Sequence, residues 1–233
     1  ESGNKDQLGL GPVAGWMEAV STWDEDAANG SFSIPKIRSS DSLKWLRYRH
    51  IIPTNDDWDA ARDGPLQPSN DEYFFDDAES MGPRPQLITD FCGYNTYTGG
   101  HGATTDDAYW VADLTLTCDV EIVEAGDQSE VVVELNEGVH CYRCRIDVST
   151  GNAKLVSVNR YSGAAESEVV LAEANSDLVG TGDWELRFAN VDNRICLWID
   201  DDLVDFGDAA NYIEDESQTP SPQDEDLIPV GIA

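Results

Sequence analysis

Apolar and polar residues alternate over many short stretches of this chain, and the alternation predicts β-strands. The longest stretch covers residues 109–123, where Thr and acidic side chains separate apolar residues at every second position: Leu114, Leu116, Cys118, Val120 and Ile122. A strand points successive side chains to opposite faces. The spacing therefore predicts one strand that places its apolar face on a core.

The residues that follow predict an antiparallel hairpin and several further strands. Residues 129–135 and 139–148 have strand patterns and flank a turn at Asn136-Glu137-Gly138. The remaining predicted strands cover residues 153–158, 168–172, 184–190, 194–199 and 203–206. Many short strands at even spacing are typical of a sandwich or barrel. Helical periodicity is weak throughout, and residues 13–23 are the only modest candidate for a helix.

The length of the chain fits a single domain of this class. It has 233 residues, a size that one all-β domain reaches. We expect residues 1–12 to form a flexible N-terminal segment and residues 13–233 to form one domain. The stretch between Pro53 and Pro85 is rich in Asp and Pro. It is long for a connection, so we expect a loop that packs over the sandwich through its aromatic residues, Trp58, Tyr73, Phe74 and Phe75.

The charge excludes several kinds of partner. The chain has 46 acidic and 14 basic side chains, for a formal charge of −32. Such a body repels phosphate, so we expect neither nucleic-acid binding nor docking to anionic lipid head groups. No apolar run approaches the length of about 20 residues that a membrane helix needs. The first twelve residues lack the features of a secretory signal, and we expect the chain to be a piece of a longer protein.

The five cysteines do not predict a disulfide framework. They are Cys92, Cys118, Cys141, Cys144 and Cys196. Their number is odd, and the lone C-x-x-C at Cys141 and Cys144 has no second pair to complete a zinc site. Alternation along the strand places these two thiols on opposite faces, where they cannot bridge each other. We therefore expect free thiols that are buried or partly buried.

Several short strings, taken in order along the chain, resemble one family. They are WLRYRH (45–50), QLITDF (86–91), YNT (94–96), WVADL (110–114), CRIDV (144–148), RFANVD (187–192), LWID (197–200) and DLIPVGIA (226–233). Together they resemble the large extra domain of type I signal peptidase-like proteins from planctomycete bacteria. Residues 184–206 also resemble the last part of a laminin-G or concanavalin-like jelly roll. We expect an all-β, concanavalin-like jelly-roll sandwich of two antiparallel sheets with long loops.

The resemblance implies a peptidase parent, but the catalytic pair of that family is not matched in this chain. The family uses a Ser in a Ser-Met-x-Pro box and a downstream Lys as base. Ser80-Met81-Gly82-Pro83 fits the box, yet Arg84 stands where the family has Thr, and the flanks are charged instead of apolar. The only downstream lysine, Lys154, lacks the Arg that follows the family base. We therefore interpret these four residues as a turn.

We therefore expect a non-catalytic accessory domain that binds or scaffolds. The parent would be a serine endopeptidase that cleaves signal peptides of exported proteins, with its Ser-Lys pair outside this chain. The resemblance implies a place on the extracytoplasmic side, tethered to the membrane through the parent. The implied partners are the rest of the parent peptidase or an exported protein.

The alternative is a free-standing carbohydrate-binding or glycosidase-like jelly roll. Glycosidases that resemble laminarinases carry Glu-x-Asp-x-Glu on one strand, which sets a nucleophile and an acid on one face. The matching positions here are Thr117, Asp119 and Glu121, so the nucleophile position is empty. A lectin-like version needs an exposed aromatic platform, for which the candidates are Trp16, Trp23, Trp58 and Tyr161.

A third hypothesis is a spacer stabilised by calcium. Laminin-G-like domains often hold a calcium ion at a sandwich edge through carboxylates and carbonyls. The candidate ligands are Asp106, Asp107, Asp192 and Asp200. No EF-hand pattern is present. No other cofactor is indicated, and a thermal melt with and without chelator tests the ion.

Basic residues gather in one early part of the chain. Arg47 and Arg49 alternate with Tyr48 and would share one strand face. One interpretation is ion pairing with the chain's own acids. The other is a docking surface for another part of the parent protein. Replacing both arginines by Glu separates the two, because internal pairs would cost stability whereas a docking surface would cost association.

Overall fold

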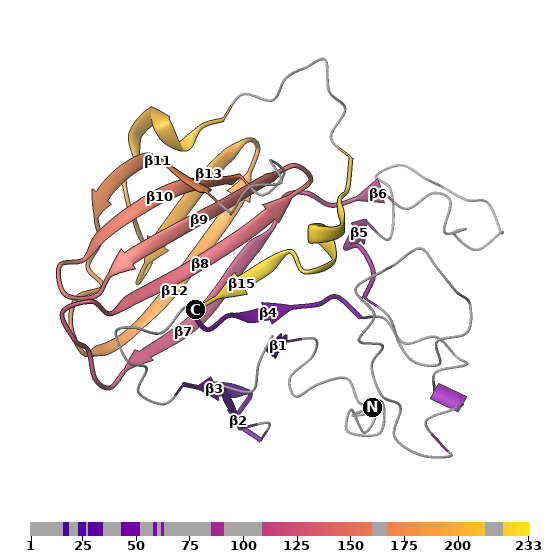
Figure 1. Cartoon of the computed structure of the whole chain (residues 1–233), viewed down its shortest axis with the longest axis horizontal. Coiled ribbons are helices and arrows are strands. Elements are labelled where there is room, and N and C mark those ends of the chain that lie inside the picture. Colours follow the sequence, from indigo (N-terminus) through magenta and orange to yellow (C-terminus); the bar gives the residue numbers. More distant parts are fainter. Residues whose placement is uncertain are drawn as a thin grey trace.

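Two antiparallel sheets lie face to face in the computed structural model (Figure 1). The structure describes residues 16–18, 23–26, 28–34, 43–51, 58–59, 62, 85–90, 109–159, 167–212 and 221–233. Strands dominate these residues. The predicted all-β sandwich is confirmed. The predicted flexible segment 1–12 and almost all of the loop between Pro53 and Pro85 lie outside the described residues.

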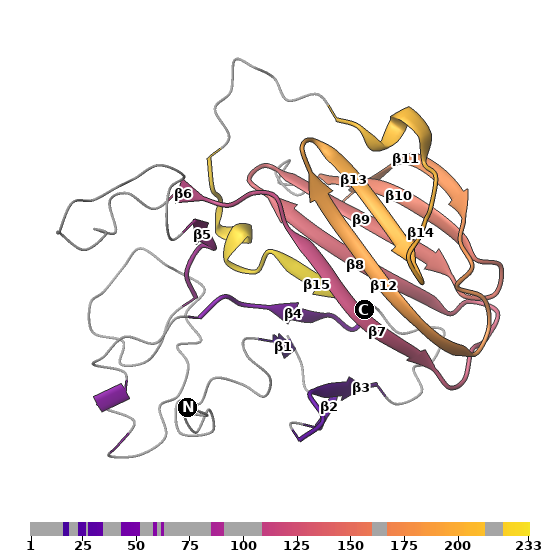
Figure 2. The same ribbon diagram turned by 180° about the vertical axis from the view of Figure 1, so that it is seen from behind.

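The larger sheet has seven strands in the order β1-β4-β15-β8-β9-β10-β11. Their bounds are Trp16–Glu18 (β1), Leu46–Tyr48 (β4), Val230–Ile232 (β15), Glu130–Glu137 (β8), His140–Asp147 (β9), Asn152–Asn159 (β10) and Ser167–Asn175 (β11). The smaller sheet has four strands in the order β14-β13-β12-β7 and is seen from its own side in Figure 2. Their bounds are Asp202–Leu203 (β14), Arg194–Ile199 (β13), Gly182–Val191 (β12) and Thr115–Ile122 (β7).

Four further strands form two small ladders beside the sandwich. Strand β2 (Asp24–Asp26) pairs with β3 (Ser31–Ser33), and β5 (Thr89–Asp90) pairs with β6 (Tyr109–Trp110). Two short 3₁₀ helices cover Gly207–Ala210 and Asp224–Leu227. Between them, residues 213–220 lie outside the described residues. Among the described residues, no helix is long and apolar enough to cross a bilayer.

The core lies between the sheets and is made by the alternating positions of both. Apolar side chains from β8, β9 and β10 meet those from β7, β12 and β13, and the fully buried ones include Val133, Cys144, Ile146, Leu155, Leu186, Phe188 and Leu197. On β7, Leu116 is buried and the other alternating apolar residues pack partly buried against this core. The face predicted from the sequence is therefore confirmed.

The predicted hairpin of residues 129–148 is confirmed, but its turn is shorter than predicted, because Asn136 and Glu137 belong to β8 and pair with β9. Strands β8 and β9 pair from Glu130↔Asp147 to Glu137↔His140 around Gly138, which has a positive φ of 54°. Strands β12 and β13 turn at Asp192 and Asn193, both with positive φ. Asn and Asp tolerate this left-handed region, and two such residues in succession match the twist of the flanking strands.

The thiols lie as the alternation predicts. Cys144 is in the core between the sheets, whereas Cys141 is on the opposite face of β9 and packs with Val156 and Val158. Cys118, Cys141, Cys144 and Cys196 are free, and each is buried or partly buried. Cys92 lies outside the described residues.

Three further sequence predictions need correction. The helix predicted for residues 13–23 is wrong for Trp16–Glu18, which form β1 because they find a strand partner in β4. The strand predicted for residues 109–123 is two strands, since β6 joins β5 whereas β7 joins β12. The strand predicted for 203–206 ends at Leu203, and the buried side chains of Val204 and Phe206 fill the core from irregular backbone.

Candidate functional site

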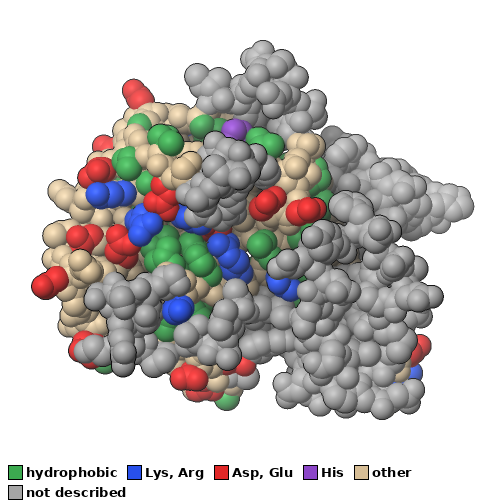
Figure 3. All heavy atoms as spheres, in the orientation of Figure 1, with side chains coloured by type: hydrophobic (Ala, Val, Ile, Leu, Met, Phe, Trp, Pro, Cys, Tyr) green, Lys and Arg blue, Asp and Glu red, His purple; other side chains and the backbone are tan. Residues whose placement is uncertain are grey.

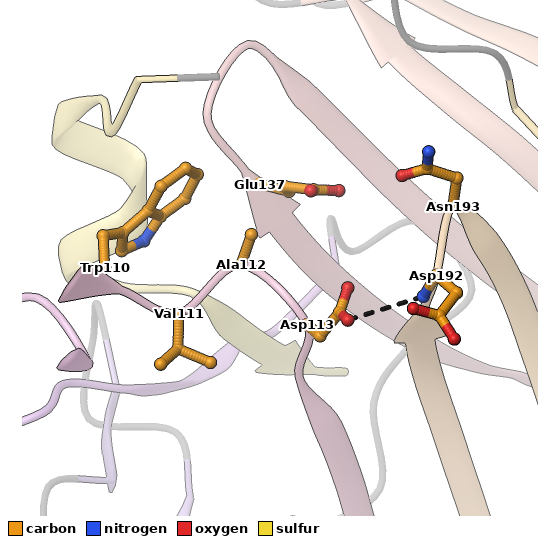
Figure 4. A pocket seen from close by; sticks show the side chains of 7 residues that line it. All are labelled: Trp110, Val111, Ala112, Asp113, Glu137, Asp192 and Asn193. Atoms are coloured by element: carbon orange, nitrogen blue, oxygen red, sulfur yellow. Dashed lines mark hydrogen bonds between the residues drawn. The ribbon is translucent and has the colours of Figure 1, made fainter. Parts of the chain in front are cut away.

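One end of the sandwich carries an open pocket of about 600 Å³. Its lining comes from the segment after β6, the end of β8 and the β12–β13 turn, and comprises Trp110, Val111, Ala112, Asp113, Glu137, Asp192 and Asn193. Figure 4 shows the Trp110 ring and the Glu137 carboxylate facing the same space from two sides. The pocket thus combines one aromatic ring, three carboxylates and one amide.

Glu137 lies at the base of this pocket and bridges the two sheets. It is the last residue of β8, on the inner face, and only 5% of it is exposed. Its Oε2 accepts hydrogen bonds from Asn190 Nδ2 on β12, at 2.5 Å, and from the Tyr212 hydroxyl, at 2.6 Å. The same hydroxyl is 2.7 Å from Asn190 Oδ1. A polar cluster therefore continues the apolar core to the end of the sandwich.

Backbone contacts hold the parts of the pocket in place. The Asn190 amide donates to the Leu114 carbonyl and ties the segment before β7 to β12. The Tyr212 amide donates to the Asn193 carbonyl, which sets the phenol beneath the β12–β13 turn. A Cβ at Gly138 would lie 3.6 Å from the Trp110 ring, so this ring packs on the β8–β9 turn.

The electrostatics of the pocket are one-sided. Asp113, Glu137 and Asp192 are acidic, and among the described residues no Lys or Arg lines the pocket. Burial, reinforced by the hydrogen bond and the negative charge of Glu137, raises the pKa of Tyr212 well above its ordinary value of 10.0. Tyr212 is therefore a neutral hydrogen-bond donor at physiological pH.

A buried carboxylate anchors the C-terminal 3₁₀ helix to the same end. Asp226, of which 2% is exposed, accepts hydrogen bonds from the Gly138 and Gln223 amides. Burial raises the pKa of Asp226, and the nearby charges of Glu225 and Glu137 act in the same direction, although the two amides oppose them. The β8–β9 turn is thereby fixed from behind.

A second charged cluster, the outer-face ladder, crosses the larger sheet on the side away from the core. It consists of Arg47, Glu134, Arg143, Glu168, Arg145 and Glu130. Glu134 is fully buried and pairs with both Arg47 and Arg143. Figure 3, which views this face, shows basic and acidic side chains side by side around a small apolar group. The ladder is internally neutralised, in contrast to the pocket.

Comparison with known proteins gives no family assignment. No protein-family model, curated protein or solved structure matches this chain. The resemblance to signal peptidase-like proteins is therefore carried by the short strings alone and stays a prediction.

Of the residues considered for catalysis, the three that the structure describes, Lys154, Asp119 and Glu121, are partly or fully exposed. The Lys154 ammonium is 3.7 Å from Glu173 Oε1, and its side chain is 44% exposed. Ser80 lies outside the described residues. Asp119 and Glu121 are exposed on the outer face of β7, opposite Glu185 and Asp183 of β12. This is the solvated strand face that the sequence indicates for them.

Two of the described thiols, Cys118 and Cys144, have the character of core residues. Burial raises the pKa of Cys118 to about 11, with a smaller contribution from Asp119. Burial alone raises the pKa of Cys144 even further. The thiolate is the reactive form of cysteine, so both side chains are poor nucleophiles at neutral pH.

The predicted calcium ligands are not brought together where they are described. Asp192 and Asp200 occupy the turns at opposite ends of β13, and Asp200 accepts a hydrogen bond from the Glu185 amide. Asp106 and Asp107 lie outside the described residues. Within the described part of the chain, no group of three or more His, Cys, Asp or Glu side chains is placed to hold a metal ion.

The predicted aromatic platform is described only in part. The Trp23 indole donates a hydrogen bond to the Lys44 carbonyl at 3.0 Å, which uses its polar edge inside the fold. Trp58 is 38% exposed. The side chain of Trp16 and the whole of Tyr161 lie outside the described parts. The carbohydrate hypothesis stays a prediction.

The two candidate docking arginines have different surroundings. Arg47 pairs with Glu134 and lies over the Trp45 ring at 4.3 Å, as internal ion pairing requires. Arg49 is half-buried next to β4. The geometry of Arg47 therefore fits internal ion pairing. For Arg49, the association experiment remains the test of a docking surface.

Of the residues that line the pocket, sequence reasoning named only Asp192, as a candidate calcium ligand. Glu137 and Asn190 carried a readable signal, because each is polar at a position where its strand turns apolar residues to the core. Trp110, Asp113 and Tyr212 carried none, since the contacts that hold this end together join residues 75 and 79 positions apart.

Proposed function

We propose that this chain is a non-catalytic accessory module of a signal peptidase-like parent. It binds either another part of that parent or an exported protein, on the extracytoplasmic side of the membrane to which the parent is tethered. The finer expectation of a concanavalin-like jelly roll belongs to the same proposal. It is supported by the laminin-G-like residues 184–206, which make up the β12-β13-β14 hairpins of the smaller sheet.

The state of Lys154 is the observation that carries the non-catalytic part. A lysine that acts as a base must lose its proton, which requires burial away from carboxylates. Lys154 is instead solvent-exposed and beside Glu173. The only lysine downstream of Ser80 therefore lies at the surface, without the burial that a lysine base needs.

The strings that carry the resemblance have architectural roles, which supports a module selected for its shape. Arg47 belongs to the buried pairs of the larger sheet. Asp200 ties two strands of the smaller sheet by accepting from Glu185. Asp226 fixes the β8–β9 turn. These three residues hold parts of the sandwich together.

The deciding experiment starts from the full-length gene product. We expect it to contain a membrane anchor and a Ser-Lys peptidase region outside these residues. Cleavage of a fluorogenic signal-peptide substrate is then measured for the parent, for the parent without the module, and for this chain alone. Removing a binding module should raise KM and leave kcat nearly unchanged, because uniform binding is lost without loss of transition-state contacts.

Two variants of the isolated chain provide the control. Ser80→Ala and Lys154→Ala should leave its background hydrolysis unchanged. Turnover by the chain alone that either substitution abolishes would contradict the proposal. A parent gene without any peptidase region would contradict the signal peptidase context.

A further inference from the structure

The fold twice places a guanidinium between a tryptophan ring and a carboxylate. On the larger sheet, Arg47 and Arg143 lie over Trp45, at 4.3 and 5.0 Å from the ring centre, and both pair with Glu134. A planar cation gains from a ring face and from a carboxylate at the same time. This chain therefore uses Trp, Arg and Glu together as a recurring packing unit.

The second example is on the smaller sheet. Arg187 lies 5.9 Å from the Trp198 ring centre and is 2.8 Å from Glu185 Oε1. Register explains the contact, because Arg187 and Trp198 are direct partners across β12 and β13. The unit thus recurs in both sheets.

The end pocket has the ring and the carboxylates of this unit without the cation. Trp110, Asp113, Glu137 and Asp192 line it, and no basic residue does so among the described residues. Figure 4 shows the ring and the Glu137 carboxylate separated by open space. The components that hold an arginine elsewhere in the molecule therefore face solvent here.

The burial of Glu137 and the neutral groups that contact it distinguish this pocket from an exposed group of acidic residues. It is 95% buried, and both of its hydrogen bonds from described residues reach Oε2 and come from neutral groups. No fully buried side-chain oxygen of the described residues lacks a hydrogen-bond partner, and no described group donates to Oε1. Oε1 is therefore not fully buried, and we infer that it is the oxygen on the side of the pocket that Glu137 lines. Buried carboxylates are normally paired with cations, as Glu134 is.

We propose that this pocket binds the arginine side chain of a partner polypeptide. The guanidinium stacks on Trp110 and donates to Glu137 Oε1, while Asp113 and Asp192 at the mouth attract it. A guanidinium suits the site better than an ammonium, since its flat fork matches a ring face and a carboxylate together. This inference rests on the proposed function, because it names the chemistry of the partner that the binding module would take. The affinity of the pocket for arginine is measurable whatever the parent does.

The test is a solution titration of the whole chain by NMR. The probe is N-acetyl-arginine methylamide, and the control is the citrulline analogue, which has the same shape without the charge. We expect saturable shifts at the Trp110 indole and the Asn190 and Asn193 side-chain amides. Citrulline should bind at least about tenfold more weakly, because a charged hydrogen bond is lost.

Charge-matched variants separate the pocket from the general acidity of the chain. Asp113→Asn with Asp192→Asn should weaken arginine binding several-fold. Asp119→Asn with Glu121→Gln removes the same charge from the outer face of β7 and should leave it unchanged. Glu137→Gln tests the buried oxygen directly, provided that its amide spectrum remains that of the folded chain.

Three outcomes would overturn the assignment. They are equal binding of arginine and citrulline, equal losses in the two double variants, and saturable shifts with neutral monosaccharides but not with arginine. Each of these would leave the peptidase-module proposal standing, because that proposal depends on the parent gene and its cleavage kinetics.

Discussion

Glu134 and Glu137 are buried acids three positions apart on β8, and the strand points them to opposite faces. Glu134 points away from the core and meets two arginines, Arg47 and Arg143. Glu137 points inward and meets the neutral donors of Asn190 and Tyr212. At the scale of single residues, Glu134 is neutralised by two arginines of the chain, whereas Glu137 accepts hydrogen bonds from neutral groups among the described residues.

Glu134→Gln should destabilise the protein strongly. The substitution keeps the shape but removes the only negative charge that is fully buried between Arg47 and Arg143. Breaking a buried ion pair by removing one partner costs about 3 to 5 kcal/mol. Urea denaturation of the variant should show a loss in this range in the free energy of unfolding.

A surface pair provides the control for this loss. Glu173→Gln removes the partner of Lys154, where both side chains are nearly half exposed. The expected change is within about 1 kcal/mol. Equal losses in the two variants would show that burial does not set the strength of these pairs.

Tyr212→Phe should flatten the alkaline decline in stability. Burial and Glu137 raise the pKa of Tyr212 in the folded state, so only the unfolded chain ionises near the ordinary value of 10.0. The stabilising contribution is therefore complete below about pH 10 and is lost as the pH rises further. Urea denaturation from about pH 8 to about pH 11 should show a steeper fall for the unaltered chain than for the variant.

Tyr48 serves as the comparison for this titration. Burial alone raises the pKa of Tyr48. Tyr48→Phe should remove its own share of the decline and keep that of Tyr212. Identical pH profiles for the unaltered chain and Tyr212→Phe would contradict the role given to the Glu137 contact.

At the scale of elements, the short strand β15 joins the N-terminal strands to the main sheet. Gly231 on β15 stands between Arg47 on β4 and Glu134 on β8 in register. A Cβ there would lie 2.9 Å from Arg47 Nη1 and 3.0 Å from the Trp45 ring. The missing side chain lets Arg47 reach across to Glu134. The absence of a side chain at Gly231 thus allows the buried Arg47–Glu134 ion pair to form across β15.

At the scale of the whole molecule, a formal charge of −32 works against compactness. Like charges on a folded surface repel each other, and salt screens exposed charges over a Debye length of about 10 Å at 0.1 M. The buried pairs around Glu134 are screened much less. Added salt should therefore relieve more repulsion than it removes attraction.

The melting midpoint should accordingly rise with ionic strength. We expect a higher midpoint at about 0.5 M than at about 0.02 M NaCl, with the same rise in KCl, because screening does not depend on the cation. Calorimetry of the chain at both concentrations provides the measurement. A midpoint that falls with salt would mean that exposed ion pairs outweigh the repulsion.

The strands of the sandwich could be predicted where the alternation was long. Leu116, Cys144 and Phe188 each lie on the face that the spacing assigns to the core. The prediction failed for residues 13–23, because a three-residue strand is specified by its partner β4 and not by its own sequence. It failed again at residues 109–123, where one apolar pattern is divided between two ladders.

By itself, the sequence determined the all-β class, the hairpins and the faces of the long strands, because alternation and turn chemistry are local properties of the chain. Only the tertiary structure decided which distant segments meet. It set Arg47 beside Glu134, and it brought Trp110, Glu137 and Tyr212 to one end of the sandwich. These contacts depend on how strands pair and sheets stack, and such pairing is a property of the whole fold.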